Sequence, residues 1–110
     1  MPSQGEVWQI RFPEDFDRPG IVVSRNELNR GRLNLVVPCT ASRVEERIGY
    51  PNYVFLPAGM GGLTEPTLAQ THLIQPVEIE QFMWQRGMVD DEKLGEVLQA
   101  LAWVVDLYPE

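Results

Sequence analysis

The chain has 110 residues, a formal net charge of −7 and a single cysteine, Cys39. This length fits one domain over residues 1–110, and one cysteine excludes a scaffold held by internal disulfides. The polar N-terminus lacks the apolar run of a signal peptide, and no apolar stretch approaches a membrane span, so we expect a soluble cytoplasmic protein. Taken alone, the negative charge argues against nucleic acid as a partner.

The charge is unevenly distributed along the chain. Residues 18–40 hold four arginines and one acid, whereas residues 90–110 hold six acids and one base. Arginine suits bidentate contacts with carboxylate or phosphate groups. The sequence therefore predicts a local arginine patch between Arg18 and Thr40, with solvated surface arginines as the ordinary alternative.

The first two thirds of the chain have the alternating pattern of short strands, and the end has a helical period. Asp90 is a suitable N-cap, and apolar residues recur every three or four positions from Leu94 to Val105. We therefore expect a mainly β fold with α, in which a small curled antiparallel sheet packs against a C-terminal helix. Strands are expected at 6–12, 20–24, 33–37 (leading into 38–40), 52–56 and 67–77, the last of these broken near Pro76. Turns are expected at 13–17 and 59–62, one helical turn at 26–29, and a short helix at 78–84.

The inventory of reactive side chains excludes several common sites. One cysteine and one histidine are too few for a structural zinc site, and neither a GxxxxGK[ST] loop nor a GxGxxG loop opens a helix. What remains is a metal-free and cofactor-free site built from arginine, threonine and serine, with His72 as a further candidate. Arginine can neutralise a developing phosphorane, and RNA supplies its own nucleophile, so this inventory is compatible with phosphate chemistry.

Six segments, in this order and spacing, resemble the MazF/PemK family of toxin endoribonucleases. They are Gly5–Trp8 (the family's GEVW), Arg18–Ser24 (RPVLVVS), Val36–Thr40 (VVPxT), Tyr53–Leu56 (HVEL), Gly61–Leu63 before the last strand at 67–77, and Val89–Glu92 (LSDEE).

The resemblance implies an SH3-like β-barrel with a C-terminal helix, of the type shared by the PemK and CcdB toxins. It also implies a homodimer that cuts single-stranded RNA at short motifs without a metal, leaving a 2′,3′-cyclic phosphate, and that is silenced by a cognate antitoxin. The family's catalytic arginine and threonine match Arg18 and Thr40. The alternatives are an ion pair of Arg18 with Asp15 or Asp17, and a turn-capping hydroxyl for Thr40.

Four further residues are candidates for catalysis or substrate binding: His72, Gln70, Ser42 and Pro19. Histidine is the side chain that most readily exchanges a proton near neutral pH, although a lone histidine on a strand is more often structural. Gln70 is expected to pack or to contact RNA. The chain departs from the family in its short acidic loop at 13–17 and in having His72-Leu73 where many members have an acid and a glutamine.

Two other functions remain open at this stage. The related CcdB toxins share the fold and poison DNA gyrase, so the chain could be a non-nucleolytic, gyrase-inhibiting or partner-binding protein. It could also be a barrel whose nuclease site has decayed and that only binds a partner.

Overall fold

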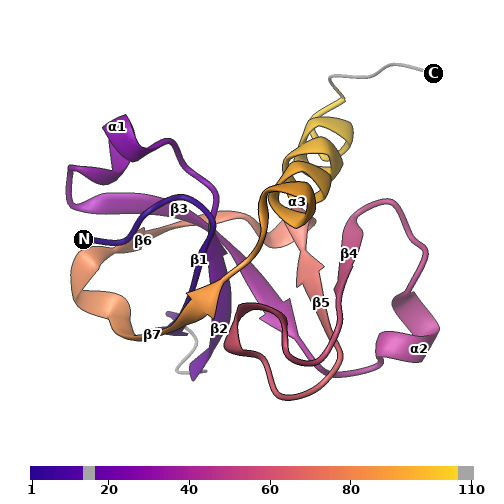
Figure 1. Cartoon of the computed structure of the whole chain (residues 1–110). Coiled ribbons are helices and arrows are strands. Elements are labelled where there is room, and N and C mark those ends of the chain that lie inside the picture. Colours follow the sequence, from indigo (N-terminus) through magenta and orange to yellow (C-terminus); the bar gives the residue numbers. More distant parts are fainter. Residues whose placement is uncertain (14–16, 107–110) are drawn as a thin grey trace.

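A computed structural model describes residues 1–13 and 17–106 of the chain (Figure 1). Its strands form an antiparallel sheet in the order β4-β5-β3-β2-β1-β7, and β6 pairs with the first half of β3. The strands are β1 Glu6–Arg11, β2 Asp17–Val22, β3 Leu33–Thr40, β4 Tyr53–Leu56, β5 Thr67–Gln70, β6 Gln75–Glu78 and β7 Phe82–Met88.

The longest helix, α3, covers one side of this sheet, and the other helices are single turns. As predicted, Asp90 caps α3, because its carboxylate accepts a hydrogen bond from the Lys93 backbone N–H at 2.7 Å. None of the helices in residues 1–13 and 17–106 is long and apolar enough to cross a membrane. The helices are α1 Asn26–Asn29, α2 Val44–Arg47, η1 Met60–Gly62, η2 Thr71–Leu73, η3 Ile79–Gln81 and α3 Asp91–Val104.

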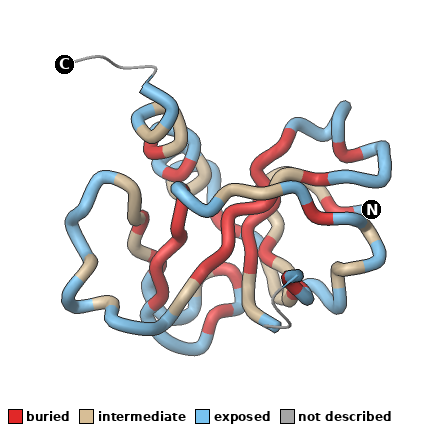
Figure 2. The backbone as a smooth tube through the Cα atoms, turned by 180° about the vertical axis from the view of Figure 1, so that it is seen from behind, coloured by how far each residue is buried: buried red, intermediate tan, exposed pale blue. Residues whose placement is uncertain are grey.

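The prediction of a mainly β fold with a C-terminal helix is confirmed. The sheet curls like a barrel but does not close, since no ladder in the described part of the chain joins β4 to β7. Buried residues run through the central strands and the facing side of α3 (Figure 2). One apolar cluster lies between sheet and helix and includes Val7, Val37 and Val97, and a second lies on the other face around Ile10 and Val36.

Two local predictions are wrong. The short helix expected at 78–84 is one turn of 3-10 helix followed by β7, because β7 fills the free edge of β1 with a ladder from Glu6↔Met88 to Ile10↔Phe82. The extended stretch expected at 67–77 is broken earlier than near Pro76, because η2 at Thr71–Leu73 divides it into β5 and β6. Pro76 lies inside β6, which tolerates a residue without an N–H because it pairs with β3 on one side.

Candidate active site

Arg18 and Thr40 lie level with each other on neighbouring strands. Arg18 is the second residue of β2 and Thr40 is the last residue of β3. The ladder between these antiparallel strands pairs Val22 with Val36 and Gly20 with Pro38. Continuing that register by two residues brings Arg18 opposite Thr40, and side chains of opposed residues project from the same face of a sheet. The two candidates therefore lie at the same end of the β2–β3 pair and on the same face.

The Thr40 side chain is half-buried and already takes part in the turn that follows β3. Its Oγ1 accepts a hydrogen bond from the Ser42 backbone N–H at 3.1 Å. A hydroxyl that accepts one hydrogen bond still has its own proton to donate. The capping role anticipated for Thr40 is thus present and leaves the hydroxyl able to contact a phosphate. Ser42 itself is exposed and contributes its backbone to this contact.

The acidic residues expected beside Arg18 can be only partly placed. Asp17 is exposed and accepts a hydrogen bond from Arg11 Nε at 3.3 Å. Asp15, the other acid considered as an ion-pair partner of Arg18, lies outside the described residues. Arg18 is half-buried at the start of β2, opposite Ile10 of β1.

A second arginine, Arg86 of β7, reaches this end of the sheet and was not identified from the sequence. Its guanidinium donates to the Gln9 Oε1 at 2.8 Å and approaches the Gly62 carbonyl oxygen at 3.4 Å. It also lies over the Trp84 ring, 5.2 Å from the centroid. Because Gln9 and Gly62 come from distant segments, no local motif could have indicated this arrangement.

A small cavity of about 150 Å³ lies at the same end of the β2–β3 pair, and neither Arg18 nor Thr40 lines it. Pro19 and Ala41, which follow Arg18 and Thr40 in sequence, line its wall. Pro19, predicted as a substrate contact, follows Arg18 on β2, so its side chain projects from the opposite face of the sheet to the candidate pair. The remaining lining residues are Leu63, Thr64, Glu65, Thr67 and Arg86.

The buried thiol of Cys39 responds to both arginines. Burial raises the pKa of Cys39 to about 12, while the positive charges of Arg18 and Arg86 act in the opposite direction. Both guanidinium groups therefore act electrostatically on the end of β3. Since only the thiolate is a good nucleophile, a thiol held protonated in this way is unsuited to covalent catalysis.

His72 and Gln70 lie away from this end of the sheet. Thr40 pairs with Leu68, so Gln70 is two residues farther along β5, opposite Tyr53, and His72 follows in η2. Gln70 is buried, and its Oε1 has no hydrogen-bond partner among the described residues. His72 is exposed rather than half-buried, and its Nδ1 lies 2.9 Å from the Asn52 Nδ2.

The arginine patch predicted over residues 18–40 is divided between two ends of the molecule. Arg18 is the second residue of β2, whereas Arg25, Arg30 and Arg32 lie around α1, after that strand has ended. Six residues of extended strand span about 20 Å, so these groups do not form one surface. Arg86 is the second arginine of the site, in place of the neighbours that the sequence suggested.

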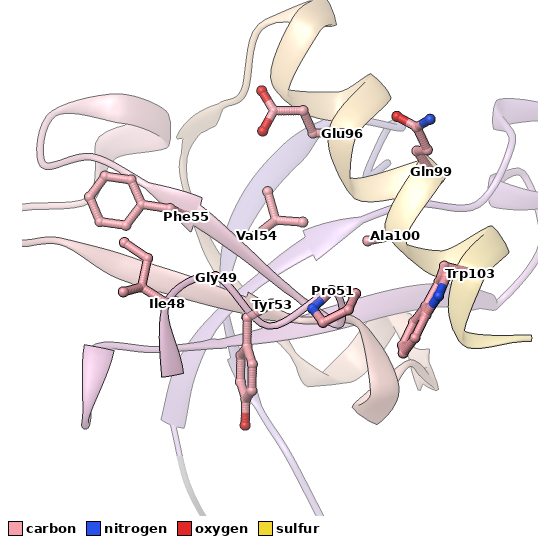
Figure 3. A pocket seen from close by; sticks show the side chains of 10 residues that line it. All are labelled: Ile48, Gly49, Pro51, Tyr53, Val54, Phe55, Glu96, Gln99, Ala100 and Trp103. Carbon is pink, nitrogen blue, oxygen red and sulfur yellow. The ribbon is translucent and has the colours of Figure 1, made fainter. Parts of the chain in front are cut away.

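A larger hollow lies elsewhere, between β4 and α3 (Figure 3). It measures about 610 Å³ and is lined mainly by apolar side chains, including Val54, Ala100 and Trp103. Tyr53 borders this hollow, but its ring points away from it (Figure 3). No predicted site residue lines this hollow, so its size does not make it the candidate active site.

No group of three or more His, Cys, Asp or Glu side chains in residues 1–13 and 17–106 is arranged to hold a metal ion.

Residues 3–105 match the family of PemK-like, MazF-like toxins of type II toxin–antitoxin systems. The chain belongs to this family. It is 28% identical to "Endoribonuclease MazF9" of Mycobacterium tuberculosis, over 98% of this chain and 99% of that protein. This agreement supports the nuclease interpretation over the gyrase-inhibiting alternative.

Solved structures of toxins share the fold. An endoribonuclease from a mycobacterial species, solved with its cognate antitoxin, superposes with a TM-score of 0.83 at 21% identity and covers 97% of each chain. A MazE–MazF crystal structure from Deinococcus radiodurans gives a TM-score of 0.76 at 23% identity, over 94% of this chain and 95% of that one. At 21% and 23% sequence identity, this structural similarity shows that the fold is shared and nothing further.

Proposed function

We propose that this MazF-like toxin is a metal-independent endoribonuclease that cuts single-stranded RNA at short motifs, with Arg18 and Thr40 as its catalytic residues. The observation that supports this proposal most strongly is the level position of these two side chains at one end of the β2–β3 pair. Arg86 adds a second positive charge that acts, with Arg18, on the end of β3.

The proposed reaction is a transfer within the RNA itself. The 2′-oxygen forms a bond to the neighbouring phosphorus, and the bond from phosphorus to the 5′-oxygen breaks. The 2′-hydroxyl loses a proton and the departing 5′-oxygen gains one. The products are a 2′,3′-cyclic phosphate and a 5′-hydroxyl, so neither water nor a cofactor is consumed in this step.

The two side chains have different roles in this scheme. The Arg18 guanidinium stabilises the extra negative charge of the phosphorane, a role suited to a side chain that keeps its protons. The Thr40 hydroxyl donates a hydrogen bond to a non-bridging oxygen while it accepts from the Ser42 amide. The family resemblance also implies that Arg18 transfers a proton. We favour charge stabilisation over this second role, because a guanidinium releases its protons reluctantly.

A cleavage assay with a long RNA in EDTA tests this proposal. Wild-type protein should produce discrete fragments, and Arg18→Ala should cut about 100- to 1,000-fold more slowly, as expected for loss of one group that stabilises a transition state. Thr40→Val should also be impaired, whereas Thr40→Ser keeps the hydroxyl and should recover most activity. Arg30→Ala, an exposed arginine beside α1, is the matched control. Unchanged cutting by Arg18→Ala and Thr40→Val, or no cutting by wild type, would contradict the proposal.

We further propose that the protein acts in the cytoplasm as a homodimer that a cognate antitoxin silences. The mycobacterial relative solved with its antitoxin supports the antitoxin part. Light scattering at micromolar concentration tests the assembly, with a dimer expected and a monomer contradicting it. Expression without the antitoxin should arrest growth, and coexpression should restore it.

A further inference from the structure

A group of aromatic and cationic side chains lies where α2 leads into β4, outside the candidate active site. Tyr53 is its centre: the Tyr50 ring is 6.5 Å from it, the His72 ring is 5.3 Å from it, and the Arg47 guanidinium carbon is 5.8 Å from its centroid. We refer to Arg47, Tyr50, Tyr53 and His72 as the aromatic platform. Tyr50 is 58% exposed, so its ring is available for contact with a ligand.

The backbone beneath the platform is held by several hydrogen bonds. The Tyr53 N–H donates to the Tyr50 carbonyl at 3.0 Å, and the Thr71 N–H and hydroxyl both donate to the Asn52 carbonyl at 3.1 and 2.8 Å. The Asn52 side chain in turn lies 2.9 Å from the His72 ring nitrogen. The rings are therefore arranged in advance of any ligand, which lowers the entropy that binding must remove.

The platform shares a face of the sheet with the candidate catalytic pair. Thr40 is paired with Leu68, and Leu68 with Phe55, so Thr40 and Phe55 project from the same face. Tyr53 is two residues before Phe55 and therefore lies on that face as well. From Thr40, its Cα is displaced by about 10 Å across two strand spacings and about 7 Å along the strand. This separation places the platform beside the catalytic pair without overlapping it.

The chemistry of the platform suits a nucleobase. Proteins bind single-stranded RNA by stacking unpaired bases on aromatic rings and on arginine, while positive charge follows the phosphates. Arg47 supplies such a charge beside Tyr53. The neighbouring acids Glu45 and Glu46 line a separate hollow with Ala41 and Phe55.

We propose that the aromatic platform is a binding site for an unpaired base of the single-stranded RNA substrate, outside the phosphate that is cut. This proposal rests on the proposed function, because it assigns a substrate contact to the same enzyme. Tyr50 and Tyr53 stack the base, Arg47 contacts the adjoining phosphate, and His72 supports the edge of the Tyr53 ring. The platform raises the affinity for RNA and leaves the chemical step to Arg18 and Thr40.

Binding and cleavage can be measured separately. Fluorescein-labelled 2′-O-methyl oligoribonucleotides of uniform sequence cannot react at the 2′-oxygen, and their anisotropy reports binding to the full-length chain. Tyr50→Ala should weaken binding about 5- to 150-fold, the range expected from loss of one stacked base. Tyr50→Phe keeps the ring and should bind like wild type. Trp103→Ala, an exposed aromatic on α3 that is 47% exposed, is the control for loss of any surface ring.

The cleavage assay supplies the second readout. Tyr50→Ala should raise KM with little change in kcat, because the platform lies away from the phosphate that reacts. If Tyr50→Ala binds RNA and cuts it like wild type, the platform proposal is overturned while the nuclease proposal stands. If wild type binds the oligonucleotides but cuts no RNA, and Tyr50→Ala weakens binding, the platform proposal stands while the nuclease proposal fails. Wild-type protein that binds none of the oligonucleotides overturns the platform.

Discussion

At one end of the β2–β3 pair Arg18 stands level with Thr40, and at the other end Arg25, Arg30 and Arg32 surround α1. The first end contains a hydroxyl, a cavity and a second arginine that is fixed by Gln9. The second end contains a buried amide network and an arginine engaged with Glu80. In Figure 1, α1 lies near the start of β3, and α2, which follows the end of β3 along the chain, lies on the opposite side of the molecule.

The α1 end is organised by Asn29, which is buried. Its side chain accepts hydrogen bonds from the Ser24 hydroxyl and from Asn34 Nδ2, the latter at 2.8 Å, and donates to the Ser24 carbonyl at 2.9 Å. Because these bonds join α1 to β3, they stabilise the fold. The arginines at the two ends thus differ in role because their surroundings differ. Local positive charge at the first end also explains how a chain of net charge −7 can present a phosphate site.

The largest expected effect comes from adding one methyl group at Gly62, beside the backbone of Arg86. A Cβ at Gly62, where φ is +73°, would lie 2.1 Å from the Arg86 carbonyl oxygen. Gly62→Ala should lower the free energy of unfolding by at least about 3 kcal/mol, measured by urea denaturation. Gly59→Ala is the control: φ is +96° and nothing lies within 4 Å, so the loss should be about 1–2 kcal/mol. Equal losses of stability in Gly62→Ala and Gly59→Ala would show that the close approach to the Arg86 carbonyl does not add to the destabilisation.

The second prediction concerns the α1 end. Asn29→Ala leaves Ser24 and Asn34 without their buried partner, so the free energy of unfolding should fall by about 2–3 kcal/mol. Leu28→Ala, at an exposed position on α1, should change it by less than about 0.5 kcal/mol. RNA cleavage per folded molecule should remain at the wild-type rate in both variants. A large loss of cleavage in folded Asn29→Ala would contradict the division between the two ends.

The third prediction uses the pKa of Cys39. Burial raises this pKa to about 12 in the folded protein, although the positive charges of Arg18 and Arg86 act to lower it. In the unfolded chain the thiol loses its proton near its ordinary pKa of 9.0. Between about pH 9 and 12 the unfolded state therefore binds fewer protons than the folded state. Stability contributed by this thiol is therefore complete below pH 9 and is lost as the pH rises. The wild type should lose up to about 1.4 kcal/mol per pH unit more than Cys39→Ala in urea titrations. Parallel pH profiles for the two proteins would refute the raised pKa.

The smallest effect is expected from the exposed ion pair of Arg32 with Glu80 at the α1 end. Exposed pairs gain little because water screens both charges and the side chains lose freedom. Arg32→Ala should leave the thermal midpoint and RNA cleavage unchanged within error. A clear loss of cleavage would mean that this end contributes to RNA binding after all.

Local sequence signals predicted much of the fold. The alternating pattern of 6–12 and the buried run at 20–24 gave strands, and Asp90 with the apolar period after it gave α3, because these signals act within a few residues. The segment 82–88 was missed since its polar and apolar residues do not alternate, and the free edge of β1 determines its conformation. The helical turn at 44–47 was also missed.

The candidate site was only partly predictable for the same reason. Arg18 and Thr40 stand in motifs, and the register of two adjacent strands brings them level. Arg86 is positioned by Gln9, which is 77 residues away in the chain, and such a contact leaves no local pattern. The position of His72 depends on where β5 ends, so its placement beside Tyr53 could not be foreseen.

The central claim is that the RNA's own 2′-hydroxyl attacks a phosphate held by Arg18 and Thr40. Its most direct test maps a cut site in a synthetic RNA and then removes the 2′-oxygen from the single nucleotide on the 5′ side of that cut. We expect wild-type protein to bind the modified RNA without cutting it at the mapped site, whereas the unmodified RNA should be cut there to leave a 2′,3′-cyclic phosphate. Cleavage of the modified RNA at the same position would contradict it.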